Sequence, residues 1–358
     1  MIYTVVMAGG TGTRFWPKST NVLPKQFLKL FGDKTMIQST IDRLSGFINI
    51  DNCMVVTNNN YVNIVKKQLP EIPADMIIGE KIAKNTAPCV AAAAAILNRK
   101  DPDSVMVVLP ADHHITEPVR FKQVVKRAVL AAQNDESLVT IGIKPEQPET
   151  GYGYIHFDEK EKINIEESDV YKVINFTEKP DLDTAKRFIQ TGNYLWNSGM
   201  FVWKTSAILK AFKKHMPQIY ELSEQIMDSD DLQGEIDLFY EACPSVSIDY
   251  GVMEKADNVL VVPGEFGWND VGSWKAVYEL SEKDGNSNSI EAENCFVKDS
   301  FGNLVQSDNG KIIAAIGVEN LAIVETEKAI LICNLDHAQD VKTVFEYLKS
   351  KEGLDKFL

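Results

Sequence analysis

The chain has 358 residues, of which 44% are hydrophobic and 25% charged, a composition typical of an ordinary folded protein and not of a disordered one. Its formal net charge is −14, from 37 Lys and Arg against 51 Asp and Glu. This balance argues against a nucleic-acid-binding protein, which needs clustered cations on its surface. It does not exclude a mononucleotide ligand, because one nucleotide needs only a few local cations and backbone amides.

Cysteine usage and hydropathy predict the compartment. The five cysteines are odd in number and contain no C-x-x-C pair, so neither a disulfide framework nor a zinc site is indicated. The amino-terminal segment lacks a basic region, and no apolar run is long enough to cross a membrane. We therefore expect a cytoplasmic protein with no membrane partner.

The first part of the chain alternates short apolar runs with helical patterns. Strands are expected at 2–7, 53–57, 76–79, 105–109 and 138–143, and helices at 36–46, 64–68, 87–99 and 121–134. Continuous apolar strands separated by helices are typical of a mostly parallel sheet that is buried on both faces. The pattern thus predicts the α/β class with a doubly wound sheet.

The pattern changes after Gly151 and again near residue 286. Antiparallel strands are expected at 151–157 and 170–176, then a strand at 195–203, helices within 206–243, a strand at 259–262 and a helix at 274–281. Beyond 286, short apolar runs separated by turns predict a small all-β unit, either a sandwich or a parallel β-coil. A helix at 338–349 closes it. The expected domains are 1–285 and 286–358, and the exposed edge of the β-unit is compatible with a homodimer.

A glycine-rich loop follows the first strand and carries the strongest functional signal. Its backbone N–H groups can approach a polyanion without interference from Cβ atoms, and two cations nearby add positive charge. The glycine-loop residues are Gly9, Gly10, Thr11 and Gly12, and the cations are Arg14 and Lys25. The loop lacks the Gly-Lys-Ser/Thr of the Walker motif. Phe15 stands where a dinucleotide fingerprint has its third glycine, which disfavours a nicotinamide-dependent dehydrogenase.

Two aspartates are candidate metal ligands. Asp112 follows the apolar run 105–109, at the end of a strand where doubly wound sheets bind ligands. Asp270 lies in the Gly267–Trp274 segment. Mg²⁺ takes one or two protein carboxylates together with substrate phosphates, so the pair would suit phosphoryl transfer. The alternative for each is a structural role in a turn or helix cap.

Five segments, in this order, resemble the sugar-1-phosphate nucleotidylyltransferase family and together cover residues 1 to about 280. They are the glycine-rich loop with Pro24-Lys25, the Pro110-Ala111-Asp112 segment, Phe176–Pro180, Trp196–Phe201 and Trp268–Trp274. The Phe15-Trp16-Pro17 and Glu80–Pro88 segments resemble the bacterial mannose-1-phosphate guanylyltransferases in particular. The tail from Asn286 resembles their short left-handed β-helix. The resemblance implies a Rossmann-like sheet of the nucleotidyltransferase type A fold.

The same resemblance implies a reaction and a set of sites. GMP would pass from GTP to mannose 1-phosphate, with Mg²⁺, by in-line attack of the sugar phosphate on the α-phosphorus. Gly9, Gly10, Thr11, Gly12, Asn85 and Thr86 would bind the nucleotide, Arg14 and Lys25 would be catalytic, Asp112 and Asp270 would hold the metal, and Gly153, Glu178, Lys179 and Asn197 would bind the sugar phosphate. Two alternatives stay open. One is another pair, such as glucose 1-phosphate with UTP or dTTP, and the other is a non-catalytic sugar-nucleotide sensor.

Overall fold

The computed structural model describes residues 1–134 and 136–358. Contacts divide the described chain into two compact units. The first, here called the sheet unit, comprises Met1–Gly9, Ile41–Ala111 and Ile115–Trp268. The second, the coil unit, comprises Gly10–Thr40, Asp112–His114 and Asn269–Leu358. The coil unit therefore contains most of the glycine-rich loop together with the C-terminal β-structure. The expected domain boundary at residue 285 stays a prediction.

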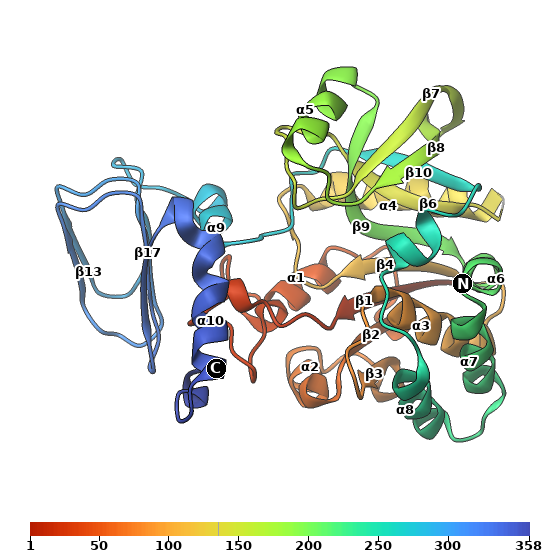
Figure 1. The fold of residues 1–358 in the computed structure, drawn as a ribbon, viewed down its shortest axis with the longest axis horizontal. Helices are drawn as coiled ribbons and strands as arrows, with labels where there is room; N and C mark the ends of the chain where they lie inside the picture. The colour runs from red at the N-terminus through yellow and green to blue at the C-terminus, as the bar shows by residue number, and fades with distance from the viewer. Residues whose placement is uncertain (135) are drawn as a thin grey trace. The chain divides into compact units, whose positions relative to one another are not determined.

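Within the described residues, the sheet unit is built on a nine-stranded sheet of order β3-β2-β1-β4-β9-β6-β10-β8-β7 (Figure 1). Its strands are β1 (Ile2–Ala8), β2 (Cys53–Asn58), β3 (Ile77–Glu80), β4 (Val105–Pro110), β6 (Leu138–Ile143), β7 (Tyr154–Ile165), β8 (Ser168–Thr177), β9 (Tyr194–Lys204) and β10 (Val259–Gly264). Strands β3, β2, β1 and β4 run parallel to one another, as do β6 and β10. Strand β9 is inserted antiparallel between β4 and β6, and the predicted α/β class is confirmed.

Helices cover this sheet because its central strands are buried along nearly their whole length and need apolar partners on both faces. They are α2 (Val62–Gln68), α3 (Thr86–Lys100), α4 (Pro118–Asn134), α5 (Leu182–Thr191), α6 (Thr205–His215), α7 (Pro217–Asp228) and α8 (Leu232–Ala242). Helix α3 packs between the strands β1 and β2 and the helices α6, α7 and α8, and its residues from Ala87 to Leu97 are all buried. Small alanine side chains allow that close approach.

Helix α5 is absent from the expectations above, although the sequence carries its signals. Asp181 caps its first turn, because the carboxylate accepts a hydrogen bond from the Thr184 amide at 2.8 Å. Gly192 ends it in the left-handed conformation, with φ of 81°. Helix α1 (Met36–Asp42) is shorter than the predicted 36–46. At its start, Thr35 and Gln38 form a reciprocal cap, with each side chain accepting from the other's amide.

The coil unit contains parallel β-coils, so the parallel alternative is the correct one. Its strands are β12 (Ser289–Glu291), β13 (Cys295–Lys298), β14 (Leu304–Ser307), β15 (Ile313–Ile316), β16 (Leu321–Glu325) and β17 (Ile330–Asn334). Strands β12, β14 and β16 form one parallel ladder, β13 and β15 form a second, and β17 closes the first antiparallel. Buried Asn303 donates to the Asn288 carboxamide at 3.0 Å, which satisfies polar groups stacked between successive coils.

The remaining helices of the coil unit are α9 (Trp274–Leu280) and α10 (Val341–Ser350), the latter preceded by the 3-10 helix η7 (Leu335–Asp340). Two short strands, β5 (His114–Ile115) and β11 (Trp268–Asn269), lie where the chain passes from one unit to the other. No helix in the described ranges is both long and apolar enough to cross a membrane. All five cysteines fall in the described part of the chain and are free thiols.

Candidate functional site

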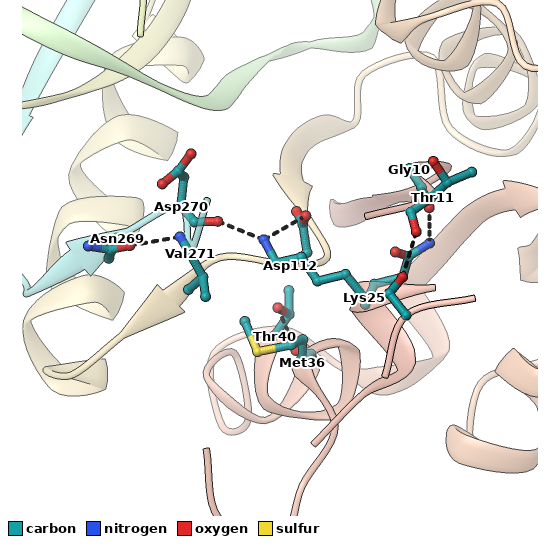
Figure 2. Close-up of polar contacts among 11 residues, drawn as sticks. Gly10, Thr11, Lys25, Met36, Thr40, Asp112, Asn269, Asp270 and Val271 are labelled. Carbon is teal, nitrogen blue, oxygen red and sulfur yellow. Dashed lines mark hydrogen bonds and ion pairs between the residues drawn. The ribbon is translucent and has the colours of Figure 1, made fainter. Parts of the chain in front are cut away.

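Three of the predicted site residues meet in the coil unit. The Lys25 ammonium lies 3.0 Å from the Asp112 carboxylate and 2.7 Å from the backbone carbonyl of Asp270 (Figure 2). Lys25 begins the 3-10 turn η2 (Lys25–Phe27), and its side chain is only 6% exposed. The sequence placed these residues 87 and 245 positions apart, so their convergence is a property of the fold.

The charge on Lys25 also sets the state of Asp112. Burial alone would raise the pKa of Asp112, but the Lys25 ammonium and His113 hold this pKa below its ordinary value. Asp112 is therefore a carboxylate at neutral pH. Its side chain is 36% exposed, which leaves it accessible to a further cation.

Asp112 and Asp270 alone would be an incomplete set of metal ligands. Figure 2 shows the Asp270 carboxylate turned away from the Lys25 ammonium while its carbonyl oxygen faces it. Across residues 1–134 and 136–358, no cluster of three or more His, Cys, Asp or Glu side chains is placed to hold a metal ion. An ion at Asp112 and Asp270 would need other oxygen ligands, and Mg²⁺ commonly takes these from water and substrate phosphates.

The glycine-rich loop is tied down by hydrogen bonds to its carbonyls. Gln26 donates to the Gly10 carbonyl at 2.9 Å, and Ser19 donates to the Thr11 carbonyl at 2.7 Å. In a trans peptide the carbonyl and the following N–H point in opposite directions. The amides of Thr11 and Gly12 are therefore directed away from Gln26 and Ser19, as an anion-binding loop requires.

Glycine is needed at position 12 for two reasons, its backbone conformation and its close contact with Lys25. It has φ of 62°, the left-handed region, and it precedes the 3-10 turn η1 (Thr13–Phe15). A Cβ at this position would lie 2.4 Å from the Lys25 Cβ. Arg14 lies exposed on η1, two residues after Gly12.

In the sheet unit, the predicted base-binding residues form the start of helix α3. Asn85 is its N-cap, with φ of 70°, and its side chain accepts from the Thr86 amide. The Thr86 hydroxyl accepts a hydrogen bond from the Ile248 amide at 2.8 Å. These contacts fix the start of helix α3, whose first two backbone amides, those of Thr86 and Ala87, are both paired within the chain.

Glu80 lies beside Gly9, at the end of β3, and was not among the predicted site residues. A Cβ on Gly9 would lie 3.2 Å from the Glu80 carboxylate. Burial raises the pKa of Glu80 to about 7. Only its place in the Glu80–Pro88 segment of the family resemblance pointed to it.

The predicted sugar-phosphate residues also come together in the sheet unit: Gly153 directly precedes β7, Glu178 and Lys179 follow β8, and Asn197 lies in β9. The Asn197 amide donates to the Gly153 carbonyl at 2.8 Å. A Cβ on Gly153 would lie 2.5 Å from the Glu178 carboxylate and 3.4 Å from the Asn197 Cβ. The Glu178 carboxylate pairs with the Lys179 ammonium at 2.5 Å. Gly153 is therefore not an ordinary strand glycine, because any side chain there would displace Glu178.

Asp249 joins this group and was missed by the sequence analysis. The Asn197 side chain donates to Asp249 at 2.7 Å and accepts from the Gly199 amide at 3.1 Å, so both ends of the carboxamide are fixed. Burial and the negative charge of Glu178 raise the pKa of Asp249 to about 6. Asp249 begins a π-helical turn, Asp249–Met253, and no sequence pattern marks it.

Replacing Asp249 by asparagine is expected to make stability less dependent on pH. The pKa of Asp249 is raised from 3.8 to about 6 on folding, so the unfolded chain loses this proton first. The free energy of unfolding then falls as pH rises from about 4 through 6, by about 1–3 kcal/mol in total. Urea unfolding at pH 4, 5, 6 and 7 measures the free energy of unfolding of both proteins. The value for Asp249→Asn, relative to that of the natural chain, should increase as the pH rises.

The matched control for this measurement is Asp257→Asn. The pKa of Asp257 is lowered by its own backbone hydrogen bond and by Lys214. Removing that carboxylate should therefore not increase the free energy of unfolding, relative to the natural chain, as the pH rises. Parallel pH profiles for Asp249→Asn and the natural chain would contradict the assignment of a raised pKa to Asp249.

Comparison with known proteins agrees with the geometry. The sequence matches a family model described as nucleotidyl transferase over residues 3–287, and a second described as a mannose-phosphate isomerase/GMP-like β-helix domain over residues 285–348. It is 40% identical to a mannose-1-phosphate guanylyltransferase of Escherichia coli, over 98% of this chain and 75% of that protein. It is 39% identical to the alginate biosynthesis protein AlgA of Pseudomonas aeruginosa, over 97% of this chain and 72% of that one.

A solved structure shows the same fold. It comes from Thermus thermophilus and is described as a "mannose-1-phosphate geranyltransferase". It superposes with a TM-score of 0.88 at 31% sequence identity, covering 98% of this chain and 99% of that one.

Proposed function

The chain belongs to the nucleotidyl transferase family and, within it, to the mannose-1-phosphate guanylyltransferases, and from this membership we propose that it transfers GMP from GTP to mannose 1-phosphate. The products are GDP-mannose and pyrophosphate. The observation that carries the proposal is the 40% identity over nearly the whole chain. The pairing of Lys25 with Asp112 and Asp270 supports it, since a sugar-nucleotide sensor would have no need of that constellation.

The chemistry requires positioning and charge more than acid–base catalysis. Mannose 1-phosphate is an anion at neutral pH, so its phosphate oxygen can attack the α-phosphorus of GTP without a general base. Two anions must be held in line against their mutual repulsion. We assign Arg14 and Lys25 to the triphosphate, with Gly9, Gly10, Thr11 and Gly12 binding through backbone groups, and Asn85 and Thr86 near the guanine.

Asp112 and Asp270 would hold Mg²⁺, which supplies positive charge to the departing pyrophosphate. Lys25 donates to both residues in the structure, so it fixes Asp112 as an ionised ligand and orders the Asp270 backbone. The protein's own part is thus to keep a carboxylate and an ammonium side by side before substrates bind, so that little reorganisation is needed during the reaction.

Gly153, Glu178, Lys179 and Asn197 would bind mannose 1-phosphate. The Glu178 carboxylate and the Asn197 carboxamide are acceptor and donor groups suited to sugar hydroxyls, and Lys179 carries a charge suited to the phosphate. Asp249 would act through Asn197, because its hydrogen bond fixes which end of the carboxamide donates.

Three further points complete the proposal. Residues 1–285 would form the catalytic domain and 286–358 the β-helical domain. The protein would be cytoplasmic. It would form a homodimer through the coil unit, where Ile330 and Ile332 are 58% and 65% exposed while Leu331 between them is buried. Exposed apolar side chains gathered on one strand are typical of an interaction surface.

Pyrophosphate release tests the choice of substrates. The purified protein would be incubated with Mg²⁺, mannose 1-phosphate and each nucleoside triphosphate in turn. Release with GTP that depends on the sugar phosphate is the expected result. Pyrophosphate release with UTP or dTTP and glucose 1-phosphate instead would support the same reaction on different substrates. No release with any pair would favour a non-catalytic sugar-nucleotide sensor.

A further inference from the structure

The glycine-rich loop does not have a core of its own but shares one with the C-terminal coils. Phe15 and Trp16 are buried in a single apolar cluster with residues of three coil strands, of η7 and of α10. Phe15 packs edge-on against Trp274, with ring centroids 5.2 Å apart. The C-terminal members of the cluster include Leu304, Ala322, Val324, Leu331, Leu335, Ala338, Val341 and Leu348.

Directional bonds add orientation to this packing. The Trp16 indole donates to the Phe357 carbonyl at 2.9 Å, and the Trp274 indole donates to the Trp16 carbonyl at 3.1 Å. Apolar contact alone can slide, whereas hydrogen bonds to one backbone carbonyl at each end fix the register of a segment. The loop is thus held through Trp16 from two directions.

An ion pair makes the third connection. The Lys18 ammonium lies 2.9 Å from the Asp308 carboxylate, in the turn between β14 and β15, and the Lys18 side chain is only 6% exposed. Asp308 is itself 60% exposed, so the pair links a buried ammonium to a solvent-facing turn of the coils. Lys18 lies between Arg14 and Lys25 in the chain, four residues after the first and seven before the second.

We propose that the C-terminal β-coils are part of the catalytic apparatus, and that Lys18 is a positioning residue that holds the glycine-rich loop on the coils by its ion pair with Asp308. This inference rests on the proposed function. It assigns to the coils the task of fixing the geometry of Arg14 and Lys25, in addition to any part in assembly. Lys18 itself does not contact the substrates in this account.

The test compares Lys18→Met, Asp308→Asn and the double variant by steady-state pyrophosphate release. Lys18→Met is expected to lower kcat about 10–100-fold, because misplacing a catalytic group by about 1 Å has that effect. The KM for mannose 1-phosphate should change less than twofold. Asp308→Asn should lower kcat less, since Asp308 is 60% exposed and water can replace part of its contact, and adding it to Lys18→Met should have no further effect.

The matched control is Lys275→Met. Lys275 forms an ion pair of 2.7 Å with Asp336, also within the coil unit, but this pair joins α9 to η7 and involves no residue of 10–40. This variant should keep the activity of the natural chain. Lys18→Met with the activity of Lys275→Met would overturn the inference, whereas an inactive natural chain would overturn the proposed function instead.

Amide hydrogen exchange gives a second readout that does not depend on activity. Peptides from residues 10–40 should exchange faster in Asp308→Asn than in the natural chain, and should be unchanged in Lys275→Met. Because Asp308 is exposed, its variant should fold even if Lys18→Met does not. Equal exchange of these peptides in Asp308→Asn and the natural chain would contradict the proposed anchoring.

Discussion

Lys25→Met is expected to lower kcat about 10²–10³-fold, which is the effect of removing one preorganised donor from a charged transition state. The substitution keeps most of the side chain's volume and removes the ammonium that lies between Asp112 and the Asp270 carbonyl. The Asp112 carboxylate would then face an incoming triphosphate without its neighbouring cation. Steady-state pyrophosphate release with saturating GTP and mannose 1-phosphate measures the loss.

Lys29→Met is the control for this prediction. Lys29 lies four residues further along the same segment and is exposed, so its loss changes the net charge equally without touching Asp112 or Asp270. Its kcat should stay within twofold of the natural value. Near-normal turnover of Lys25→Met would show that this lysine is a structural residue and not a catalytic one.

Gly12→Ala is expected to lower kcat about 10²-fold, as a displacement of a catalytic group by about 1 Å does. The new Cβ would stand 2.4 Å from the Lys25 Cβ and 3.1 Å from the Lys25 amide nitrogen, so backbone and not a flexible side-chain end must move. The left-handed conformation adds about 1–2 kcal/mol of strain. Activity and urea unfolding together separate these two effects.

Gly32→Ala is the control for this prediction. Gly32 also has a left-handed backbone conformation, but a Cβ at this position would not collide with another residue. It has φ of 68°, and no atom lies within 4 Å of its ideal Cβ. Gly32→Ala should lose only the stability that the strain removes, whereas Gly12→Ala should lose more stability and most of its activity. Equal activities would contradict the argument that Gly12 is required by the position of Lys25.

The parts of the fold that follow from local pattern were predictable from the sequence. The buried strands β1, β2, β4 and β6 are short apolar runs with clear ends, so their bounds differ little from the prediction. The insertion of β9 between β4 and β6 depends on pairing between distant segments, and period-two patterning carries no information about that. Helix α5 was missed because it is short and amphipathic, although Asp181 and Gly192 mark its ends.

Some residues of the candidate site were predictable from motifs, and others were not. Lys25, Asp112 and Asp270 were predicted individually, and the structure brings them together. Asp249 was missed because its importance lies in a contact with Asn197 across 52 residues and not in any motif around it. The shared core of the glycine-rich loop and the coils could not be predicted either. In the sequence, Trp16 and Trp274 resemble many other apolar positions, and only the fold shows that they are in contact.

The fate of the α-phosphate distinguishes guanylyl transfer from other reactions of GTP. The natural chain would be incubated with GTP labelled at the α-phosphorus, mannose 1-phosphate and Mg²⁺, and the products separated by chromatography. We expect the label to appear in GDP-mannose, in an amount equal to the pyrophosphate released, and we expect both products to be lost when mannose 1-phosphate is omitted. Label recovered only in GTP, or in GDP without a sugar nucleotide, would contradict guanylyl transfer.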